Sequence, residues 1–537
     1  MARTPLLRSI RQMMRDGLAA KMSGKPVDVI REERHQATKA AISRRRFLGG
    51  SILGGAALAL PRVAEARRNQ PTVAIIGGGI AGLTCALTLR DKGYCSTVYE
   101  ASGRIGGRMF SNTSTFAGGQ VAEWGGELID TGHTTVRRLA RRYGLPLEDL
   151  LAAEPNNATE TYHFGGDYYA KTDADADFLE MADVVLADLD GAGYPTRYDD
   201  FTPLGAELDH MSVYDWIESR VPGGHSSPLG KLLDVAYNIE YGAETPRQAS
   251  LNLLYLLGFQ PDADHLSVFG ESDERFHIRG GNQRLPQAIA DDLGDSVRTG
   301  QRLTRLRKTA TGRYQLTFER SSGTCEVNAD IVVMAVPFPV VEGIDTSTAG
   351  FDALKSTAIR ELGRGHNGKL TLQFEQRGWL GSGPWPGVSS GTTFADTGYQ
   401  ASWETTRGQP GQQGLLTLFS GGSVTDAMRS TKPFATASDS LVLQDVQRSL
   451  TQLSKVYPNL RWNGRATESL FHKAPQAGLA YSYFKVGQYT KFGGYEGARQ
   501  GNVFFCGEHT SQDFQGYMEG GASTGKSAAL EIAEDLR

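Results

Sequence analysis

Three closely spaced glycines near residue 80, and an acidic residue shortly after them, have the spacing of a dinucleotide-binding site. Gly77, Gly79 and Gly82 form the pattern G-x-G-x-x-G, and Glu100 follows the last glycine by 18 residues (100 − 82). The first glycine permits a tight turn, the second lets the backbone approach a pyrophosphate, and the third lets a helix pack closely on a strand. The carboxylate of Glu100 is then placed to accept hydrogen bonds from an adenosine ribose. A glycine loop with a purely structural role is the alternative, and the pattern alone does not choose between NAD and FAD.

The elements that must position these residues can be read in the same stretch, "PTVAIIGGGIAGLTCALTLRDKGYCSTVYEAS". Its pattern predicts a short β-branched strand at 73–76, a helix at 81–90 and a second strand at 96–99 that ends in Glu100. The glycine turn then joins the first strand to the helix, so that the phosphates meet the positive end of the helix dipole. This order of elements is typical of a Rossmann-type domain.

The next residues, "EASGRIGGRM" at 100–109, favour a flavin. Gly106 and Gly107 would let backbone amides close on the pyrophosphate from a second side, and Arg104 and Arg108 would supply a cationic fork for the phosphates. The stretch resembles the E-A-x-x-R-x-G-G-R motif of the flavin-dependent amine oxidases, the family of monoamine, L-amino-acid and polyamine oxidases.

Four further stretches resemble this family in the family's own order: "AEWGGELID" (122–130), "IRGGNQRLPQAIADDLG" (278–294), "DIVVMAVP" (330–337) and "NVFFCGEHT" (502–510). The resemblance implies an α/β fold, in which a Rossmann-type FAD-binding domain is built from discontinuous segments and a mixed-sheet α+β domain holds the substrate. It also implies that Leu303 packs near the adenine, that Glu508 points towards the ribityl chain, and that a helix starting near Met518 directs its N-terminus at the flavin.

The same resemblance implies three residues that act at the flavin. Lys369, in "LGRGHNGKLTLQF", matches the family's lysine that holds a water at flavin N5, although a strand lysine can equally be a solvated surface charge. Tyr481 and Tyr517 match the two walls of an aromatic cage that orients the amine nitrogen; a role in the core is the alternative for each. Covalently flavinylated members carry cysteine where this chain has Ala480, so FAD is expected to bind non-covalently.

Two residues bear on the choice of amine. Leu128 stands about where venom-type L-amino-acid oxidases carry an arginine for the substrate carboxylate. Asp130 falls near the position where polyamine oxidases hold a distal amine, and it can equally cap the helix predicted after it. The stretch "IEYGAETPRQASLNLLYLLGF" (239–259) resembles bacterial twin-arginine-exported amine oxidases, some of which oxidise L-amino acids. A basic L-amino acid is therefore one hypothesis for the substrate.

The overall composition excludes several other classes of function. The 537 residues, 39% hydrophobic and 22% charged, are ordinary for a soluble protein of two domains, and a net charge of −4 gives no reason to expect nucleic acid as a partner. The four cysteines show neither a CxxC pair nor a metal-ligand spacing, and the spacing of His366, His472 and His509 likewise suggests no metal site.

The N-terminal region predicts export. "SRRRFLGGSILGGAALALPRVAEA" (43–66) has a basic block, a short apolar run and an A-x-A cleavage site, and it resembles a twin-arginine signal. A basic linker followed by a buried helix is the alternative. We expect residues 1–66 to be removed after passage through the twin-arginine machinery, and the mature protein to be periplasmic or secreted with no stable membrane anchor, because the run is too short to span a bilayer.

These patterns divide the mature chain into five segments. Residues 67–150, 276–340 and 466–537 are expected to form the FAD-binding domain, the last of them with the aromatic cage, and residues 151–275 and 341–465 the substrate domain. The expected activity is FAD-dependent oxidation by O2 of a primary amine or an L-amino acid to a carbonyl compound, ammonium and H2O2. A polyamine oxidase, a flavin desaturase or porphyrinogen oxidase of the same fold, and a flavoprotein that only binds are the alternatives.

Overall fold

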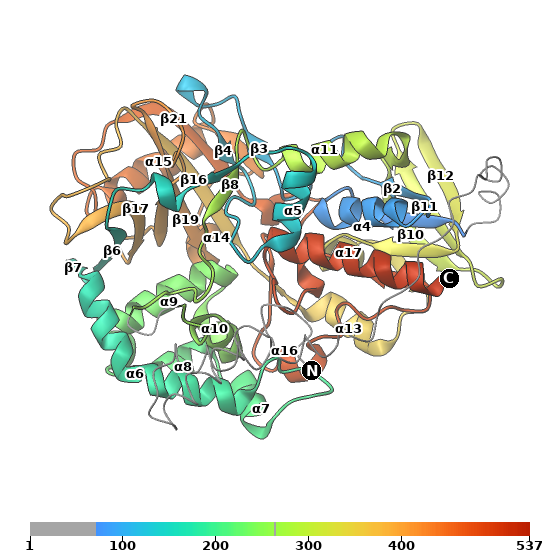
Figure 1. Cartoon of the computed structure of the whole chain (residues 1–537), viewed down its shortest axis with the longest axis horizontal. Coiled ribbons are helices and arrows are strands. Elements are labelled where there is room, and N and C mark those ends of the chain that lie inside the picture. The colour runs from blue at the N-terminus through green and yellow to red at the C-terminus, as the bar shows by residue number, and fades with distance from the viewer. Residues whose placement is uncertain (1–70, 262–264) are drawn as a thin grey trace, which may run out of the picture. The chain divides into compact units, whose positions relative to one another are not determined.

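The computed structural model describes residues 71–261 and 265–537 (Figure 1). The predicted signal peptide and N-terminal extension, residues 1–66, lie outside the described residues. Within the described ranges, no helix combines the length and the apolar character needed to cross a bilayer. Residues 71–537 form one compact unit, which contains two large sheets.

The first sheet is parallel and is assembled from distant parts of the chain. Its strands lie in the order β23–β13–β1–β2–β9, with bounds Val503–Phe505, Ile331–Met334, Val73–Ile76, Ser96–Tyr99 and Val297–Arg298. All residues of β1, β13 and β23 are buried, as expected for parallel strands covered on both faces. The prediction of a Rossmann-type domain built from discontinuous segments is confirmed.

Helices from both ends of the described chain cover one face of this sheet. They are α4 (Ile80–Asp91), α5 (Thr134–Arg142), α11 (Arg284–Leu293) and α17 (Met518–Asp535), and their apolar residues share one core with β1 and β13. Figure 1 shows α4 and α17 side by side. The two helices approach so closely that a side chain at Gly525 would lie 2.1 Å from the backbone oxygen of Ala81. The C-terminal helix therefore packs directly against the helix of the glycine motif.

A smaller sheet, antiparallel except for the parallel pair β10–β14, and several short elements complete this half. The sheet has the order β12–β11–β10–β14, with bounds Gly323–Ala329, Tyr314–Arg320, Arg302–Lys308 and Asp345–Thr348. Its apolar residues form a core with the other face of β1 and β13. The short elements include the strand pairs β3–β4 (Ser111–Asn112, Ala122–Glu123), β5–β8 (Leu147–Asp149, Phe276–Ile278) and β15–β22 (Gly363–Arg364, Ser482–Tyr483), and the helices α12 (Phe338–Glu342), α13 (Ala353–Glu361) and α16 (Gln488–Phe492).

The second large sheet is mixed, as predicted for the substrate domain. Its order is β20–β21–β16–β19–β18–β17–β6–β7, with bounds Phe434–Thr436, Trp462–Ser469, Asn367–Phe374, Gly414–Gly421, Ala401–Glu404, Val388–Ala395, Ala158–Phe164 and Asp167–Tyr169. β17 runs parallel to β6, and the other neighbours are antiparallel. β21 crosses the predicted boundary between residues 465 and 466.

Helices pack on both sides of this mixed sheet. α15 (Ser440–Leu453) covers apolar residues of β16 and β19. A second group packs against β6 and β17: α6 (Lys171–Ala192), α7 (Pro203–His210), α8 (Val213–Arg220), α9 (Pro228–Tyr241) and α10 (Ser250–Leu257). α9 begins at Pro228. The side chain of the preceding residue, Ser227, caps the helix by accepting a hydrogen bond from the Gly230 amide. Its C-terminal turn carries Ile239 and Glu240 towards the site described next.

Candidate active site

Residues of both halves, one around each large sheet, line a cavity of about 520 Å³. The C-terminal ends of the parallel strands β1, β2, β13 and β23 lead to Gly77, Glu100, Ala335 and Glu508, all of which line it, as is usual for ligand sites in open α/β sheets. Most predicted site residues also line it: Gly77, Gly79, Glu100, Arg104, Gly106, Gly107, Arg108, Leu128, Lys369, Tyr481, Glu508, Tyr517 and Met518. The residues predicted from seven stretches of sequence therefore meet at one place.

The glycine motif forms a tight cradle at one end of the cavity. Glu100 accepts a hydrogen bond from the Gly78 amide at 2.8 Å through one carboxylate oxygen, and from Ser102 through the other. Gly82 does not line the cavity, but it packs so closely under the turn that an added Cβ would lie 2.1 Å from the Gly77 carbonyl oxygen. Gly82 is thus needed for the shape of the cradle, which agrees with the role expected for the third glycine.

Gly82→Ala is expected to abolish FAD loading, because the methyl group cannot fit without moving the turn that faces the pyrophosphate. Gly103→Ala is the matched control: it lies in the same motif region, and an added Cβ meets nothing within 4 Å. The ratio of flavin to protein absorbance of the two purified variants is the measurement. Equal flavin content in both would show that the close packing at Gly82 is dispensable.

The two arginines of the second motif have different surroundings. Arg104 lies 3.9 Å over the ring of Phe110 and donates a hydrogen bond to the Gly107 carbonyl oxygen at 2.8 Å. Arg108 donates through Nη1 to the carbonyl oxygen of Ala480 and to Glu508, both at 2.9 Å. Arg108 therefore forms an ion pair with a carboxylate that offsets its charge, and the phosphate fork of Arg104 and Arg108 stays a prediction.

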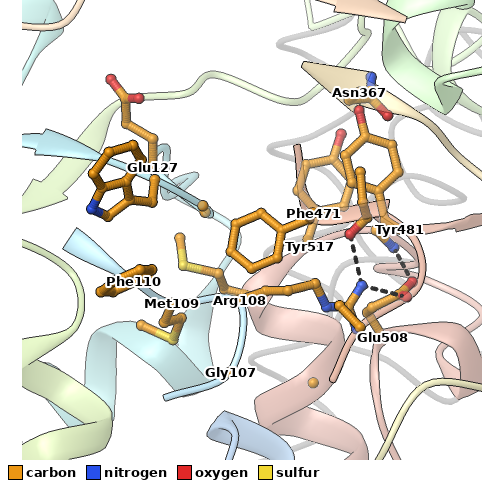
Figure 2. A pocket seen from close by; sticks show the side chains of 18 of the residues that line it. Gly107, Arg108, Met109, Phe110, Glu127, Asn367, Phe471, Tyr481, Glu508 and Tyr517 are labelled. Carbon is orange, nitrogen blue, oxygen red and sulfur yellow. Dashed lines mark hydrogen bonds and ion pairs between the residues drawn. The ribbon is translucent and has the colours of Figure 1, made fainter. Parts of the chain in front are cut away.

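Glu508 links three segments of the cavity wall. Besides the ion pair with Arg108 (Figure 2), its carboxylate accepts hydrogen bonds from the Ser482 hydroxyl at 2.8 Å and from the Gly516 amide at 2.9 Å. Burial by itself would raise the pKa of Glu508, but the Arg108 charge and these hydrogen bonds outweigh it and hold the pKa below its usual value. The carboxylate is ionised and fixed in place next to Tyr481 and Tyr517.

Lys369 points into the cavity, so the interpretation as a solvated surface charge is wrong. It lies on β16, in the interior of the mixed sheet, and its side chain is only 12% exposed. Its Nζ donates to the Gly125 carbonyl oxygen at 2.7 Å and to Glu127 at 2.8 Å, and Trp403 donates to the other oxygen of Glu127 at 2.8 Å. Burial alone would raise the pKa of Glu127, but Lys369 lowers it below the usual value.

The two cage tyrosines are anchored to adjacent residues of α9. The hydroxyl of Tyr481 donates to the Ile239 carbonyl oxygen at 2.9 Å, and the hydroxyl of Tyr517 donates to the carboxylate of Glu240 at 3.1 Å. In Figure 2 both rings lie on the side of the cavity away from Glu127. The end of one helix thus sets the direction of both rings.

Backbone geometry brings Tyr517 beside Tyr481. Gly516 has a φ of +88°, a conformation that disfavours side chains, and an added Cβ there would touch the Tyr481 ring at 3.8 Å. The edge of His133 packs on the Tyr517 ring, with centroids 5.3 Å apart. α17 begins immediately after Tyr517, so its N-terminus faces the cavity as predicted for Met518.

Two acidic residues that the sequence analysis did not single out also line the cavity. Burial, followed by the charge of Glu274, raises the pKa of Glu240 to about 8, and burial together with Asp130 raises the pKa of Glu274 to about 7. Among the described residues, none donates a hydrogen bond to the carboxylate of Glu274. The available signal was Glu240 itself, an acid in the apolar helical run "LLDVAYNIEY".

Besides Gly82, Leu303 and Asp130 are predicted site residues that do not line the cavity. Leu303 lies on β10 in the core beneath the parallel sheet, and its contact with adenine stays a prediction. Asp130 accepts hydrogen bonds from the Ser272 hydroxyl and the Glu274 amide. The alternative that Asp130 caps the following helix is also wrong: Glu519 of α17 accepts from the first amides of α5, where a capping residue would.

The cavity has the properties of a cofactor site. Both ring nitrogens of His509, and the amide nitrogen of Gln515, are buried along its wall without a hydrogen-bond partner among the described residues. Burial lowers the pKa of His509 to about 4, so its ring is neutral. Buried polar atoms of this kind normally have partners, and a bound dinucleotide would supply them. All four cysteines lie in the described part of the chain and none lines the cavity, so the prediction of non-covalent binding remains in place.

The fold and the site together define a flavin-dependent oxidoreductase. The chain belongs to the family described as flavin-containing amine oxidoreductases, whose model matches residues 80–533. The cofactor is FAD, as predicted, because the family is flavin-containing and the G-x-G-x-x-G cradle accommodates the pyrophosphate of a dinucleotide.

The chain is similar over most of its length to named oxidoreductases. It is 24% identical to nicotine dehydrogenase of Pseudomonas putida, over 93% of this chain and 98% of that protein. It is also 24% identical to L-amino acid dehydrogenase of Synechocystis, over 85% of this chain and 94% of that protein. Among solved structures, cyclohexylamine oxidase from Brevibacterium oxydans has a TM-score of 0.73 at 22% identity, over 87% of this chain and 99% of that chain.

Proposed function

We propose that this protein oxidises a primary amine to an imine, which water then hydrolyses to a carbonyl compound and ammonium. FAD, when bound, accepts the two electrons. The observation that carries the proposal is one cavity with the anchored pair Tyr481 and Tyr517 on one side and the Lys369–Glu127 pair on the other.

The residues of the chain have separable tasks in this reaction. The rings of Tyr481 and Tyr517 bound the space for the amine and orient its nitrogen, and their faces attract it if it arrives as a cation. Lys369 holds positive charge and hydrogen-bond donors at the far wall, where a water can be positioned. Glu508 and Arg108 keep the backbone around Ser482 and Gly516 in place.

Anaerobic reduction of the bound flavin by a panel of amines tests the proposal. We expect bleaching of the flavin absorbance by at least one of putrescine, cadaverine, tyramine, L-lysine and L-arginine. A flavin desaturase or porphyrinogen oxidase of the same fold, or a flavoprotein that only binds, would show no bleaching with any amine. Aerobic turnover with H2O2 formation identifies O2 as the acceptor; bleaching without peroxide identifies another acceptor, as the names of the two dehydrogenase relatives suggest.

The acidic groups of the cavity favour a substrate with a second cationic group. Glu240 and Glu274 face the cavity close to the tyrosine pair, and a nearby ammonium group favours the ionised form of both carboxylates. Leu128 offers no charge for a substrate carboxylate, and the arginines among the described lining residues are Arg104 and Arg108, both in the cofactor motif. These surroundings favour a diamine, with a basic L-amino acid as the second candidate.

Glu274→Gln is expected to reduce this preference. The ratio of kcat/KM for cadaverine (pentane-1,5-diamine) to kcat/KM for pentylamine should fall by about tenfold or more. The reason is that the isosteric amide cannot ionise to pair with the distal ammonium group. Glu271→Gln, a neighbouring glutamate outside the cavity lining, is the matched control and should leave the ratio unchanged. An unchanged ratio in Glu274→Gln would contradict the assignment of the distal amine site.

A further inference from the structure

His366, Asp426 and His472 come together on the mixed-sheet half, outside the cavity lining. His366 immediately precedes β16, Asp426 ends α14 (Gly422–Asp426), and His472 lies in the short turn Phe471–Lys473. One potential ligand atom from each residue lies within 4.8 Å of the other two. The expectation that these histidines suit no metal site rested on their spacing of 106 residues (472 − 366) and needs correction, because the fold removes that separation.

The contacts within this cluster leave one nitrogen without a partner. The Nδ1–H of His366 donates to Asp426 at 2.8 Å, and the rings of His366 and His472 stack with centroids 4.5 Å apart. Nδ1 of His472 is buried and has no hydrogen-bond partner among the described residues. A buried nitrogen of this kind is uncommon in folded proteins, and a ligand that is absent from the contacts of the chain accounts for it.

The charges around the cluster suit a cation. Two imidazole rings and one carboxylate, with ligand atoms within 4.8 Å of one another, offer nitrogen and oxygen lone pairs to a cation. The ammonium group of the neighbouring Lys473 donates a hydrogen bond at 2.6 Å to the Ser430 carbonyl oxygen. Lys473 is thus held by a partner outside the three-residue cluster. Asp426 contributes the negative charge, and its side chain is 57% exposed.

We propose that His366, Asp426 and His472 bind one divalent transition-metal ion of the zinc type. Two imidazoles and one carboxylate are ligands that Zn²⁺ prefers, whereas Mg²⁺ and Ca²⁺ prefer oxygen ligands alone. The two rings are nearly parallel, at 14°, so one of them turns for both nitrogens to meet the ion. The His366 side chain is 38% exposed and has the space to do so.

Such an ion would connect two parts of the cavity wall. Asn367 and Lys369 follow His366 on β16, and Phe471 precedes His472; all three line the cavity. Binding to the folded state alone stabilises a protein by mass action. We therefore expect Zn²⁺ to raise the melting temperature of the holoenzyme as well as to bind to it.

Calorimetric titration of the EDTA-treated, FAD-loaded enzyme with ZnCl2 tests the proposal. We expect one ion per chain, no binding of MgCl2, and a loss of affinity of about tenfold or more in His366→Ala and in His472→Ala. His210→Ala is the matched control, since His210 is an exposed histidine whose ring contacts the Ala206 carbonyl oxygen, and it should bind Zn²⁺ like the wild type. The flavin absorbance of each variant reports whether it has folded.

Two results would overturn the proposal: no stoichiometric binding of Zn²⁺ by the wild type, or unchanged binding in His366→Ala. Because His472 is partly buried and its replacement can disturb folding, the exposed His366 supplies the decisive variant. The melting temperature gives a second readout. Zn²⁺ should raise it in the wild type and in His210→Ala but leave it unchanged in His366→Ala, and an equal rise in all three would place the bound ion elsewhere.

Discussion

Lys369→Met is expected to slow reoxidation of the reduced flavin by O2 by about 10²-fold, or about 2.7 kcal/mol in activation free energy. Transfer of electrons to O2 builds negative charge on oxygen, and Lys369 places an ammonium group on the cavity wall. Methionine retains most of the side-chain volume and removes the charge. Stopped-flow absorbance after anaerobic reduction with dithionite measures the rate without any need for an amine substrate.

The same variant should be less stable, by about 3–5 kcal/mol at neutral pH, because Glu127 is left buried without its cation. In the wild type the pKa of Glu127 is held below its usual value, so its contribution to stability is present above the unfolded pKa near 4.5 and is lost on acidification. In Lys369→Met the burial remains without the charge, and the pKa rises. The difference in melting temperature between the two proteins should therefore be largest at pH 8, smaller at pH 5, and lost only as the pH falls through the lowered pKa of Glu127 in the folded wild type.

A matched double variant separates the two effects of Lys369. Lys369→Met combined with Glu127→Gln removes both charges and should recover much of the stability, while reoxidation stays slow. Slow reoxidation in both variants supports the role at the flavin. Normal reoxidation in the single variant, with only the melting temperature lowered, would make Lys369 a purely structural residue.

Tyr517→Ala is expected to retain FAD and to lower kcat/KM for the best amine by about 10²-fold or more, since one wall of the amine site and its orientation are lost. It also removes the hydroxyl that donates to Glu240, one of the two carboxylates that we place near the distal amine. The measurement is kcat/KM together with the ratio of flavin to protein absorbance. Loss of FAD in this variant would assign Tyr517 to cofactor binding instead.

Tyr517→Phe is the matched control for the ring. It keeps the aromatic wall and removes only the hydrogen bond at 3.1 Å to Glu240. We expect a smaller loss in kcat/KM, about tenfold or less, because the raised pKa of Glu240 keeps its acceptor neutral at pH 7, a hydrogen bond between neutral groups contributes about 0.5–1.5 kcal/mol, and the ring still orients the amine. If kcat/KM falls equally in the alanine and phenylalanine variants, the hydroxyl of Tyr517, and not its ring, is the group that the reaction needs.

The cofactor half of the site could be predicted because its parts are close in sequence. Strand, glycine turn, helix and acid lie between residues 73 and 100, and Gly82 packs against the Gly77 carbonyl oxygen only five residues before it. The discontinuous fold and the cavity positions of Lys369, Tyr481 and Tyr517 followed from resemblance to a family. Composition or periodicity could not have supplied them, since Lys369 alternates with apolar residues on a strand that is central in the sheet.

Local rules failed where a distant segment competes for the same group. Asp130 has the type and position of a helix cap, but the first amides of α5 are bonded to Glu519, which α17 brings from 384 residues away. Arg108 has the sequence context of a phosphate ligand, but strand β23 delivers Glu508 to it. The group that caps a helix or pairs with a charge is the one that packing places nearest to it. The order of residues along the chain does not reveal which group that is.

The sequence by itself determined a dinucleotide site and the strand–turn–helix unit around it, because glycine spacing and strand patterns act locally. The choice of FAD and the division into a parallel and a mixed sheet followed from the resemblance to the family. Only the tertiary structure decided the polar surroundings of the substrate. The end of α9 brings Glu240 to Tyr517, the segment before β8 brings Glu274 to the cavity, and β16 and α14 bring His366 and Asp426 to His472. These groups interact through space over a few ångströms while hundreds of residues can separate them, so only the packing of helices and sheets defines their partners.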